Sequence, residues 1–191
     1  KTAYEIRLSL VGSEMCIRDS SKLAGEQAVA GANPRHAIFR TAWVYSPFGK
    51  NFAKTMLQVA ETRDELSVVH DQVGNPTSAQ DIARSLWQVA AQAAASPAAL
   101  VPGIYHMTSA GEASWAEFAE EIFRVSAACG GPAARVRRIT TPQYPTPALR
   151  PANSRLDCAR LAAQFGIILP HWRASTQTCV EDLLKIKGWT S

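Results

Sequence analysis

The chain has 191 residues, of which 47% are hydrophobic and 19% are charged, and this composition fits one globular unit with a sizeable core. Its formal net charge of +4 is dispersed, and the densest basic group, Arg135, Arg137 and Arg138, has no interleaved aromatic residues, so we predict no nucleic-acid binding. No apolar run approaches the ~20 residues of a membrane span, and the four widely spaced cysteines indicate neither a zinc site nor a disulfide framework. We therefore expect a cytoplasmic protein without membrane association.

The first residues differ from the rest of the chain. Residues 4–10 alternate apolar and polar side chains, which is typical of a half-buried strand. The run Tyr4–Asp19 also resembles translated sequencing-adapter sequence, and at Ser20 the composition changes to an alanine-rich, periodic chain. We interpret residues 1–19 as a non-native leader, with a genuine strand and turn as the alternative.

From Ser20 the pattern alternates between helix and strand, which indicates an α/β fold. Three helices are predicted with both limits: Lys22–Ala30, Cys158–Phe165 and Thr178–Lys185, the last with a Thr178/Glu181 capping box. A further helix is capped by Asn51, and another starts at Ser78 and gives way to a linker at Ala91–Ala99. The remaining helix starts at a Ser114/Glu117 capping box and ends at Gly130. The predicted strands are Ala37–Tyr45, Ser67–Val69, Gly103–Met107 and Arg135–Thr140. Four prolines between Pro142 and Pro151 predict an extended segment.

The first chemical motif is Ser21–Glu26, Ser-Lys-Leu-Ala-Gly-Glu. It resembles the run around the lysine of the Tyr-x-x-x-Lys pair in the dTDP-4-dehydrorhamnose reductase family, which belongs to the extended short-chain dehydrogenases. Residues four apart share a helix face, so the ammonium favours the phenolate and lowers the tyrosine pKa. The resemblance implies that Lys22 is catalytic and contacts the nicotinamide ribose, whereas taken alone it is a solvated surface lysine.

Two parts of that family's machinery are missing from this sequence. Arg18 stands where the tyrosine is expected, and a guanidinium is too weak an acid to replace the phenol as proton donor. We expect that the true tyrosine was cut away rather than mutated. Neither Gly25 nor Gly31 supplies the glycine-rich phosphate loop of a dinucleotide site.

The run Phe39–Ser46, followed by Gly49–Phe52, resembles the family's next strand and loop. The resemblance implies that Trp43 contacts the deoxysugar nucleotide, because an indole offers a flat apolar wall and one hydrogen-bond donor. Core packing in a buried strand is the alternative. Asn51 is assigned either to the nucleotide half of the substrate or to a plain helix N-cap.

Two later segments also resemble family motifs. Residues 71–77, Asp-Gln-Val-Gly-Asn-Pro-Thr, match a loop in which Gln72 and Thr77 present polar atoms to the substrate, and a structural turn explains them equally well. Residues 144–154 match a segment near the substrate, where the fork of Arg150 suits a diphosphate. A surface or interdomain ion pair is the alternative for Arg150.

The resemblance implies the C-terminal part of a Rossmann-like, NAD(P)-binding fold with a smaller α/β substrate-binding portion. We assign residues 20–100 to the remnant of the dinucleotide-binding domain, with an inserted helix of the substrate domain, and 101–191 mainly to the substrate-binding portion. The implied reaction is NAD(P)H-dependent reduction of dTDP-4-dehydro-L-rhamnose to dTDP-L-rhamnose, with this isolated chain inactive. The rivals are a non-catalytic regulatory subunit of the same fold and another nucleotide-sugar epimerase or dehydratase.

The resemblance also implies the ligands and partners. The cofactor is NADPH or NADH, the small-molecule partner is a nucleotide sugar, and a homodimer is compatible with the intact family. Some members hold Mg²⁺ at a subunit contact, but we predict no metal ligands here, since the four histidines lack metal-ligand spacing.

Overall fold

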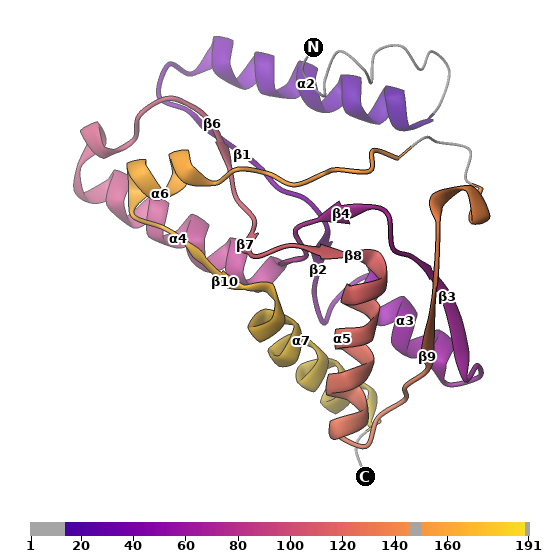
Figure 1. Cartoon of the computed structure of the whole chain (residues 1–191). Helices are drawn as coiled ribbons and strands as arrows, with labels where there is room; N and C mark the ends of the chain where they lie inside the picture. Colours follow the sequence, from indigo (N-terminus) through magenta and orange to yellow (C-terminus); the bar gives the residue numbers. More distant parts are fainter. Residues whose placement is uncertain (1–13, 146–149, 190–191) are drawn as a thin grey trace.

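The computed structural model describes residues 14–145 and 150–189, in which helices and strands alternate (Figure 1). The helices are α2 (Glu14–Ala32), α3 (Phe52–Ala60), α4 (Ala79–Ala95), α5 (Trp115–Ala128), α6 (Ala159–Phe165) and α7 (Trp172–Lys187), with 3₁₀ turns η1 (Pro97–Ala99) and η2 (Thr141–Gln143). The strands are β1 (Ala37–Arg40), β2 (Val44–Tyr45), β3 (Glu65–Val69), β4 (Val73–Gly74), β5 (Thr77–Ser78), β6 (Gly103–His106), β7 (Ser109–Ala110), β8 (Ala113–Ser114), β9 (Arg135–Ile139) and β10 (Leu169–His171). None of the described helices is long and apolar enough to cross a bilayer.

Most strand pairs are parallel, as the α/β prediction requires. The pairs β1–β6, β2–β5, β3–β9 and β7–β10 are parallel, and β4–β8 is antiparallel. Parallel strands need long crossover connections, and here helices supply them: α3 and α4 lie between β1 and β6 in the chain, and α4 and α5 between β3 and β9. The predicted α/β class is confirmed.

Apolar side chains form two cores. The larger core packs α3, α5 and α7 around β3 and is centred on Phe118, Leu57 and Trp172, each at most 1% exposed. The second core packs α4 and α6 against β1 and β6 and contains Tyr105 and Phe165. Each core draws on residues from both sides of position 100, and the predicted domain division at that position stays a prediction.

Helix α2 lies apart from both cores (Figure 1), and none of its residues belongs to either core. One link between α2 and β1 is an ion pair, in which Arg40 donates to Glu26 through Nε at 2.9 Å and Nη2 at 2.6 Å. The helix begins at Glu14 instead of the predicted Lys22, so residues 14–19 of the suspected leader continue it. The first thirteen residues, including the expected strand at 4–10, lie outside the described ones.

Local capping signals predicted some helix ends correctly and others wrongly. Asn51 caps α3, and the Ser114/Glu117 capping box opens α5, as predicted. The linker predicted from Ala91 is wrong, because alanine is a strong helix former and α4 continues to Ala95. At the N-terminus of α4, Ser78 makes no side-chain cap bond, and the Asp81 carboxylate accepts a hydrogen bond from Ser175 at 2.5 Å.

The start predicted for the last helix at Thr178 is also wrong. Helix α7 begins at Trp172, where the ring Nδ1 of His171 accepts a hydrogen bond from the backbone N–H of Arg173 at 3.3 Å. The Thr178 hydroxyl lies inside the helix and donates to the carbonyl of Ala174 at 3.4 Å. A serine or threonine that bonds back to the preceding turn no longer serves as a cap.

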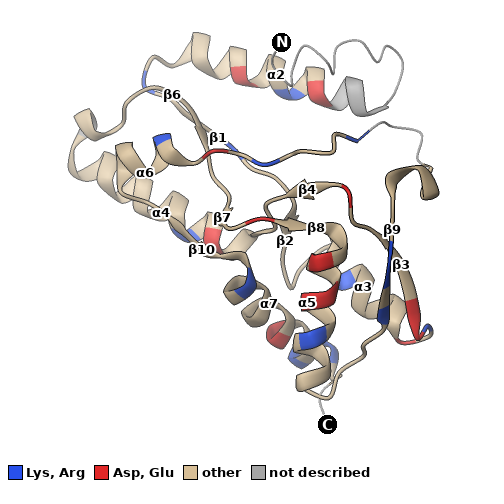
Figure 2. Cartoon of the chain, in the orientation of Figure 1, with Lys and Arg blue, Asp and Glu red and all other residues tan. Residues whose placement is uncertain are grey.

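Buried polar groups join α7 to its neighbours. Glu121 on α5 accepts hydrogen bonds from Arg124 at 2.6 and 3.0 Å and from Arg173 on α7 at 2.9 Å, and the bond from Arg124 is the main cause that lowers the pKa of Glu121. The buried Tyr45 hydroxyl shares a 3.0 Å hydrogen bond with Thr176 Oγ1 of α7, and burial raises the Tyr45 pKa. Figure 2 shows the charged residues of α5, α7 and β9 in the same part of the molecule.

Candidate ligand-binding site

Trp43 has an unusual backbone, which divides the predicted strand Ala37–Tyr45 into β1 and β2. Its φ of 49° lies in the left-handed region, and among the described non-glycine residues it is alone in having a positive φ. Such a conformation costs a bulky residue about 1–2 kcal/mol and persists only where its surroundings hold it. One such restraint is the hydrogen bond from the Thr77 N–H to the Trp43 carbonyl at 3.1 Å.

The indole of Trp43 is held on several sides. It stacks on Trp115, the first residue of α5, with ring centroids 3.5 Å apart and ring planes 6° apart. Its Nε1 donates to Ser154 Oγ at 3.0 Å. Gly74 packs directly against the ring, because a Cβ there would lie 2.5 Å from Trp43 Cε2. The sequence analysis assigned the indole N–H to a substrate hydroxyl, but in this structure the N–H donates to Ser154.

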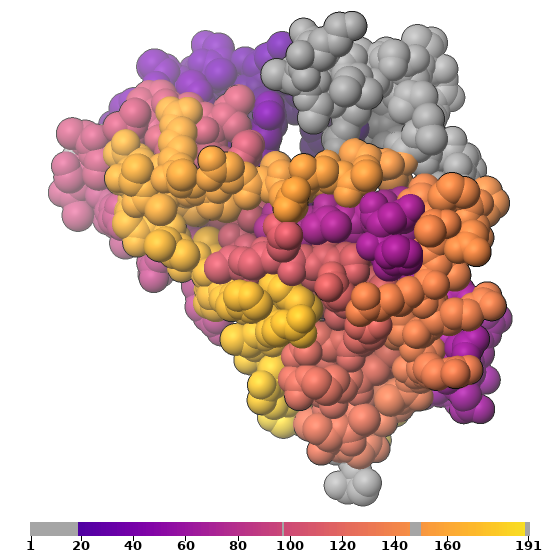
Figure 3. Space-filling model, in the orientation of Figure 1, coloured from indigo at the N-terminus to yellow at the C-terminus, as the bar shows by residue number. Residues whose placement is uncertain are grey.

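Residues 152–156 lie beside β4 and carry Ser154 to this position (Figures 1 and 3). The Val73 N–H donates to the carbonyl of Ala152 at 2.8 Å, and the Ser154 N–H donates back to Val73 O at 2.9 Å. Further along, Asn75 Oδ1 accepts from the Leu156 N–H at 2.9 Å. Three motifs that are distant in the sequence, around Trp43, 71–77 and 150–154, thus meet at one place.

The polar residues predicted for the 71–77 loop are buried. Gln72 is 6% exposed, and its Nε2 donates to Thr141 Oγ1 at 3.0 Å. Thr77 is fully buried, and its hydroxyl donates to the carbonyl of Asn75 at 2.9 Å and accepts from the Ser109 N–H at 3.3 Å. In this structure both side chains bond within the protein.

Asn51 likewise bonds to nearby backbone. Its Oδ1 accepts from the Lys54 N–H at 3.2 Å, and its Nδ2 donates to the carbonyls of Ser46 at 2.8 Å and Phe48 at 3.2 Å. This is the N-cap alternative of the sequence analysis. Arg150, by contrast, is exposed at the start of the segment that ends in Ser154, next to residues 146–149, which lie outside the described part.

The described residues do not form a dinucleotide cradle. Lys22 is exposed on α2, and the side chain of Arg18, on the same helix, lies outside the described ones. Gly25 and Gly31 are helical, and a Cβ at either would meet nothing within 4 Å, whereas a phosphate loop brings its glycines close to the ligand. Among the described residues, no group of three or more His, Cys, Asp or Glu could hold a metal ion.

Sequence reasoning missed the contacts of Trp115 with Trp43 and of Asp71 with Thr141. Trp115 was assigned to the apolar face of its helix, and nothing in the sequence signals its pairing with Trp43. Asp71 accepts from the Thr141 N–H at 2.9 and 3.0 Å and from its hydroxyl at 2.7 Å, and the backbone bond is the largest cause of its lowered pKa. These hydrogen bonds join the residues that follow β3 to the residues that follow β9.

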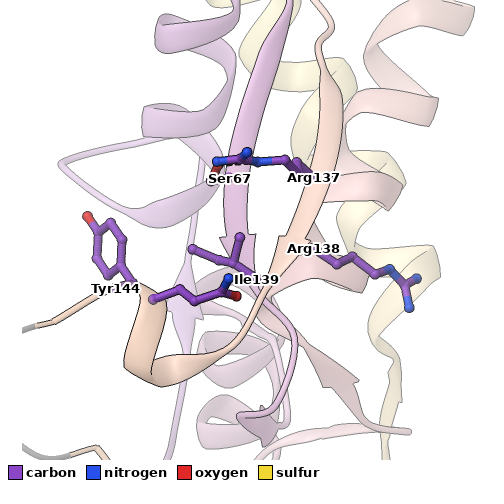
Figure 4. Close-up of a pocket in the computed structure, with 6 residues that line it drawn as sticks. Ser67, Arg137, Arg138, Ile139 and Tyr144 are labelled. Atoms are coloured by element: carbon purple, nitrogen blue, oxygen red, sulfur yellow. Dashed lines mark hydrogen bonds between the residues drawn. The ribbon is translucent and has the colours of Figure 1, made fainter.

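A surface pocket lies elsewhere. It is about 430 Å³ in volume and is lined by Ser67, Arg137, Arg138, Ile139, Gln143 and Tyr144. Of these, only Tyr144 lies in a segment that resembles a family motif. Figure 4 shows Ser67 and Arg137 facing each other across β3 and β9, where Arg137 donates to the serine hydroxyl at 2.8 and 3.0 Å. Since the guanidinium already has a partner and is largely exposed, we do not place the substrate here.

The parallel strands with helical crossovers define an α/β protein of the Rossmann-like class. Residues 15–185 match the model of the RmlD substrate binding domain, and the chain belongs to that family.

Individual relatives agree. A dTDP-4-dehydrorhamnose reductase of Sinorhizobium fredii (strain NBRC 101917 / NGR234) is 52% identical over 164 residues, which are 86% of this chain and 55% of the relative. The crystal structure of such a reductase from Clostridium acetobutylicum superimposes with a TM-score of 0.76 at 40% identity, covering 87% of this chain and 55% of that one. A Bacillus anthracis reductase in complex with NADP gives 0.74 at 30% identity, covering 85% and 54%. The chain thus spans about half the length of the curated relatives it matches.

Proposed function

We propose that this chain is the sugar-nucleotide-binding half of an NAD(P)H-dependent dTDP-4-dehydrorhamnose reductase, which reduces dTDP-4-dehydro-L-rhamnose to dTDP-L-rhamnose. The observation that carries the proposal is the meeting of Trp43 with β4 and with residues 152–156. Trp43, β4 and residues 152–154 belong to three separate segments that resemble family motifs, and the structure joins them by hydrogen bonds. The named relatives support the same reaction.

Within this proposal the chain's residues bind and orient the substrate. Trp43 supplies an apolar wall for the sugar nucleotide, and Arg150 pairs with the diphosphate through its guanidinium. Gln72, Thr77 and Asn51, which the sequence assigns to the substrate, bond within the protein and hold the loops that follow β3 and β2 in place. Lys22 is the residue assigned to the cofactor ribose and to the tyrosine.

The bound nicotinamide cofactor would supply hydride to the keto carbon. Because the described residues form no phosphate cradle and Arg18 cannot act as the phenol does, we derive no chemical step on this chain alone. The same proposal includes several further assignments. The cofactor is NADPH or NADH, the intact enzyme is compatible with a homodimer and with Mg²⁺ at a subunit contact, and it is cytoplasmic. Within this chain, residues 1–19 are a non-native leader and the domain division lies at position 100.

Titration of the 191-residue chain with dTDP-L-rhamnose, followed by calorimetry, tests this assignment. We expect saturable binding that is weakened in Arg150→Gln, and no saturable binding of NADPH at micromolar concentration. UDP-glucose serves as the control nucleotide sugar. Absence of dTDP-L-rhamnose binding by a folded chain would contradict the proposed function. Saturable NADPH binding at micromolar concentration would contradict the conclusion that the described residues form no dinucleotide-binding site.

A further inference from the structure

We infer that Trp115 and Ser154 are positioning residues that fix the orientation of the Trp43 indole, and that Trp43 meets its ligand through apolar ring surface rather than through its N–H. This inference rests on the proposed function, because it concerns how the same site recognises the sugar nucleotide.

The stacking geometry is the first support. Two indoles 3.5 Å apart and tilted by only 6° leave no room between them, so one face of Trp43 is covered by Trp115. Trp115 is itself held, since Phe52 of α3 packs against it with ring centroids 4.7 Å apart. The orientation of Trp43 is therefore set by the larger core through the first turn of α5.

The hydrogen bonds are the second support. The Trp43 N–H donates to Ser154 Oγ, and that hydroxyl donates in turn to the Val73 carbonyl at 3.1 Å. An indole has one donor, so a substrate hydroxyl could use it only by displacing Ser154. A ligand can therefore contact only the uncovered, apolar part of the ring. Such a surface suits the C–H groups of a deoxysugar or the flat face of a nucleotide base.

Gly74 is the third support. A Cβ at this position would lie 2.6 Å from Trp43 Nε1 and 2.7 Å from Ser154 Oγ, which are the two atoms of the hydrogen bond. Its φ is not positive, so alanine is compatible with the backbone, and the close contacts with the indole and the Ser154 hydroxyl forbid it. Gly74→Ala therefore displaces Trp43 without removing any core atoms.

Affinity for dTDP-L-rhamnose, near-ultraviolet circular dichroism and thermal midpoint, measured together on the 191-residue chain, test the inference. Trp115→Leu and Gly74→Ala should each weaken binding about three- to tenfold and reduce the circular dichroism of the stacked indoles. Trp115→Phe, which keeps an aromatic plane, should recover most of the affinity. Ser154→Ala should weaken binding less than Gly74→Ala.

Two control variants match these substitutions. Gly31→Ala adds a methyl group where nothing lies within 4 Å, and Trp87→Phe changes an indole that is 78% exposed. Both should bind as the wild type does. If the wild type binds dTDP-L-rhamnose and Trp115→Leu and Gly74→Ala bind it with the same affinity, the inference is wrong but the proposed function stands. Equal losses of affinity in Trp115→Leu and Trp115→Phe would overturn the inference in the same way. No binding by the folded wild type would overturn the proposed function as well.

Discussion

Replacement of Trp43 separates the contribution of its side chain from that of its backbone. The indole is half-buried, stacks on Trp115 and donates one hydrogen bond. Truncating a fully buried tryptophan costs about 3–5 kcal/mol, so for this position we expect Trp43→Ala to lower the free energy of unfolding by about 2–3 kcal/mol. For a chain of this length that corresponds to a fall in Tm of roughly 4–12 °C.

The backbone predicts a second, opposite effect. Alanine at φ 49° keeps the left-handed strain, whereas glycine adopts this conformation readily. Trp43→Gly should therefore be more stable than Trp43→Ala by about 1 kcal/mol, although it removes one more carbon. At an ordinary helical or strand position the order of the two variants would be reversed.

Urea denaturation followed by far-ultraviolet circular dichroism measures both variants against the wild type. Affinity for dTDP-L-rhamnose, measured on the same samples, should fall about ten- to a hundredfold in both. A Trp43→Gly variant no more stable than Trp43→Ala would refute the assigned backbone strain. A loss of stability with unchanged affinity would make Trp43 a core residue and remove it from the ligand site.

The buried contacts of α7 give two further predictions, and the lack of a phosphate cradle among the described residues gives a third. The pKa of Glu121 is lowered in the folded chain by hydrogen bonds and charge from Arg124 and Arg173, so its stabilisation is complete above the unfolded value of about 4.3 and is lost as pH falls through the folded pKa. Urea midpoints should therefore drop more steeply below about pH 4.3 in the wild type than in Glu121→Gln, and parallel profiles would contradict the assignment. Tyr45→Phe should cost about 0.5–1.5 kcal/mol in unfolding free energy, because Thr176 keeps its 2.7 Å bond to the Trp172 carbonyl. A larger loss on thermal melting would show that the hydroxyl has another role. NADPH fluorescence should show no saturation at micromolar concentration with this chain.

Short-range signals predicted much of the fold. Asn51 and the Ser114/Glu117 pair cap their helices as expected, because a cap depends on residues within three positions. The start of α7 was placed too late, since His171 is an uncommon cap and the first turn is stabilised by burial of Trp172 against other helices. Packing between distant segments overrides a local pattern there.

The site was predictable in its segments but not in its contacts. The motifs around Trp43, residues 71–77 and residues 150–154 were identified one by one, and they do lie together. The contacts of Trp43 depend on Trp115 and Ser154, which lie 72 and 111 positions after it in the chain. No local sequence pattern reveals partners at such a distance. The same holds for Thr77, whose burial against Ser109 no pattern within the loop indicates.

The parallel pairing of β3 with β9 sets an order of events during synthesis. Glu65 pairs with Arg135, so β3 leaves the ribosome 70 residues before its partner strand (135 minus 65), an interval of about 4–14 s at 5–20 residues per second. The larger core closes later still, when the last helix brings Trp172 and Leu183 onto α5. Until then the apolar side chains of Leu66 and Val68 have no complete cover, and the nascent chain is open to chaperones or to self-association. Slowing translation between β3 and β9 should therefore lengthen the exposed interval and lower the yield of folded chain.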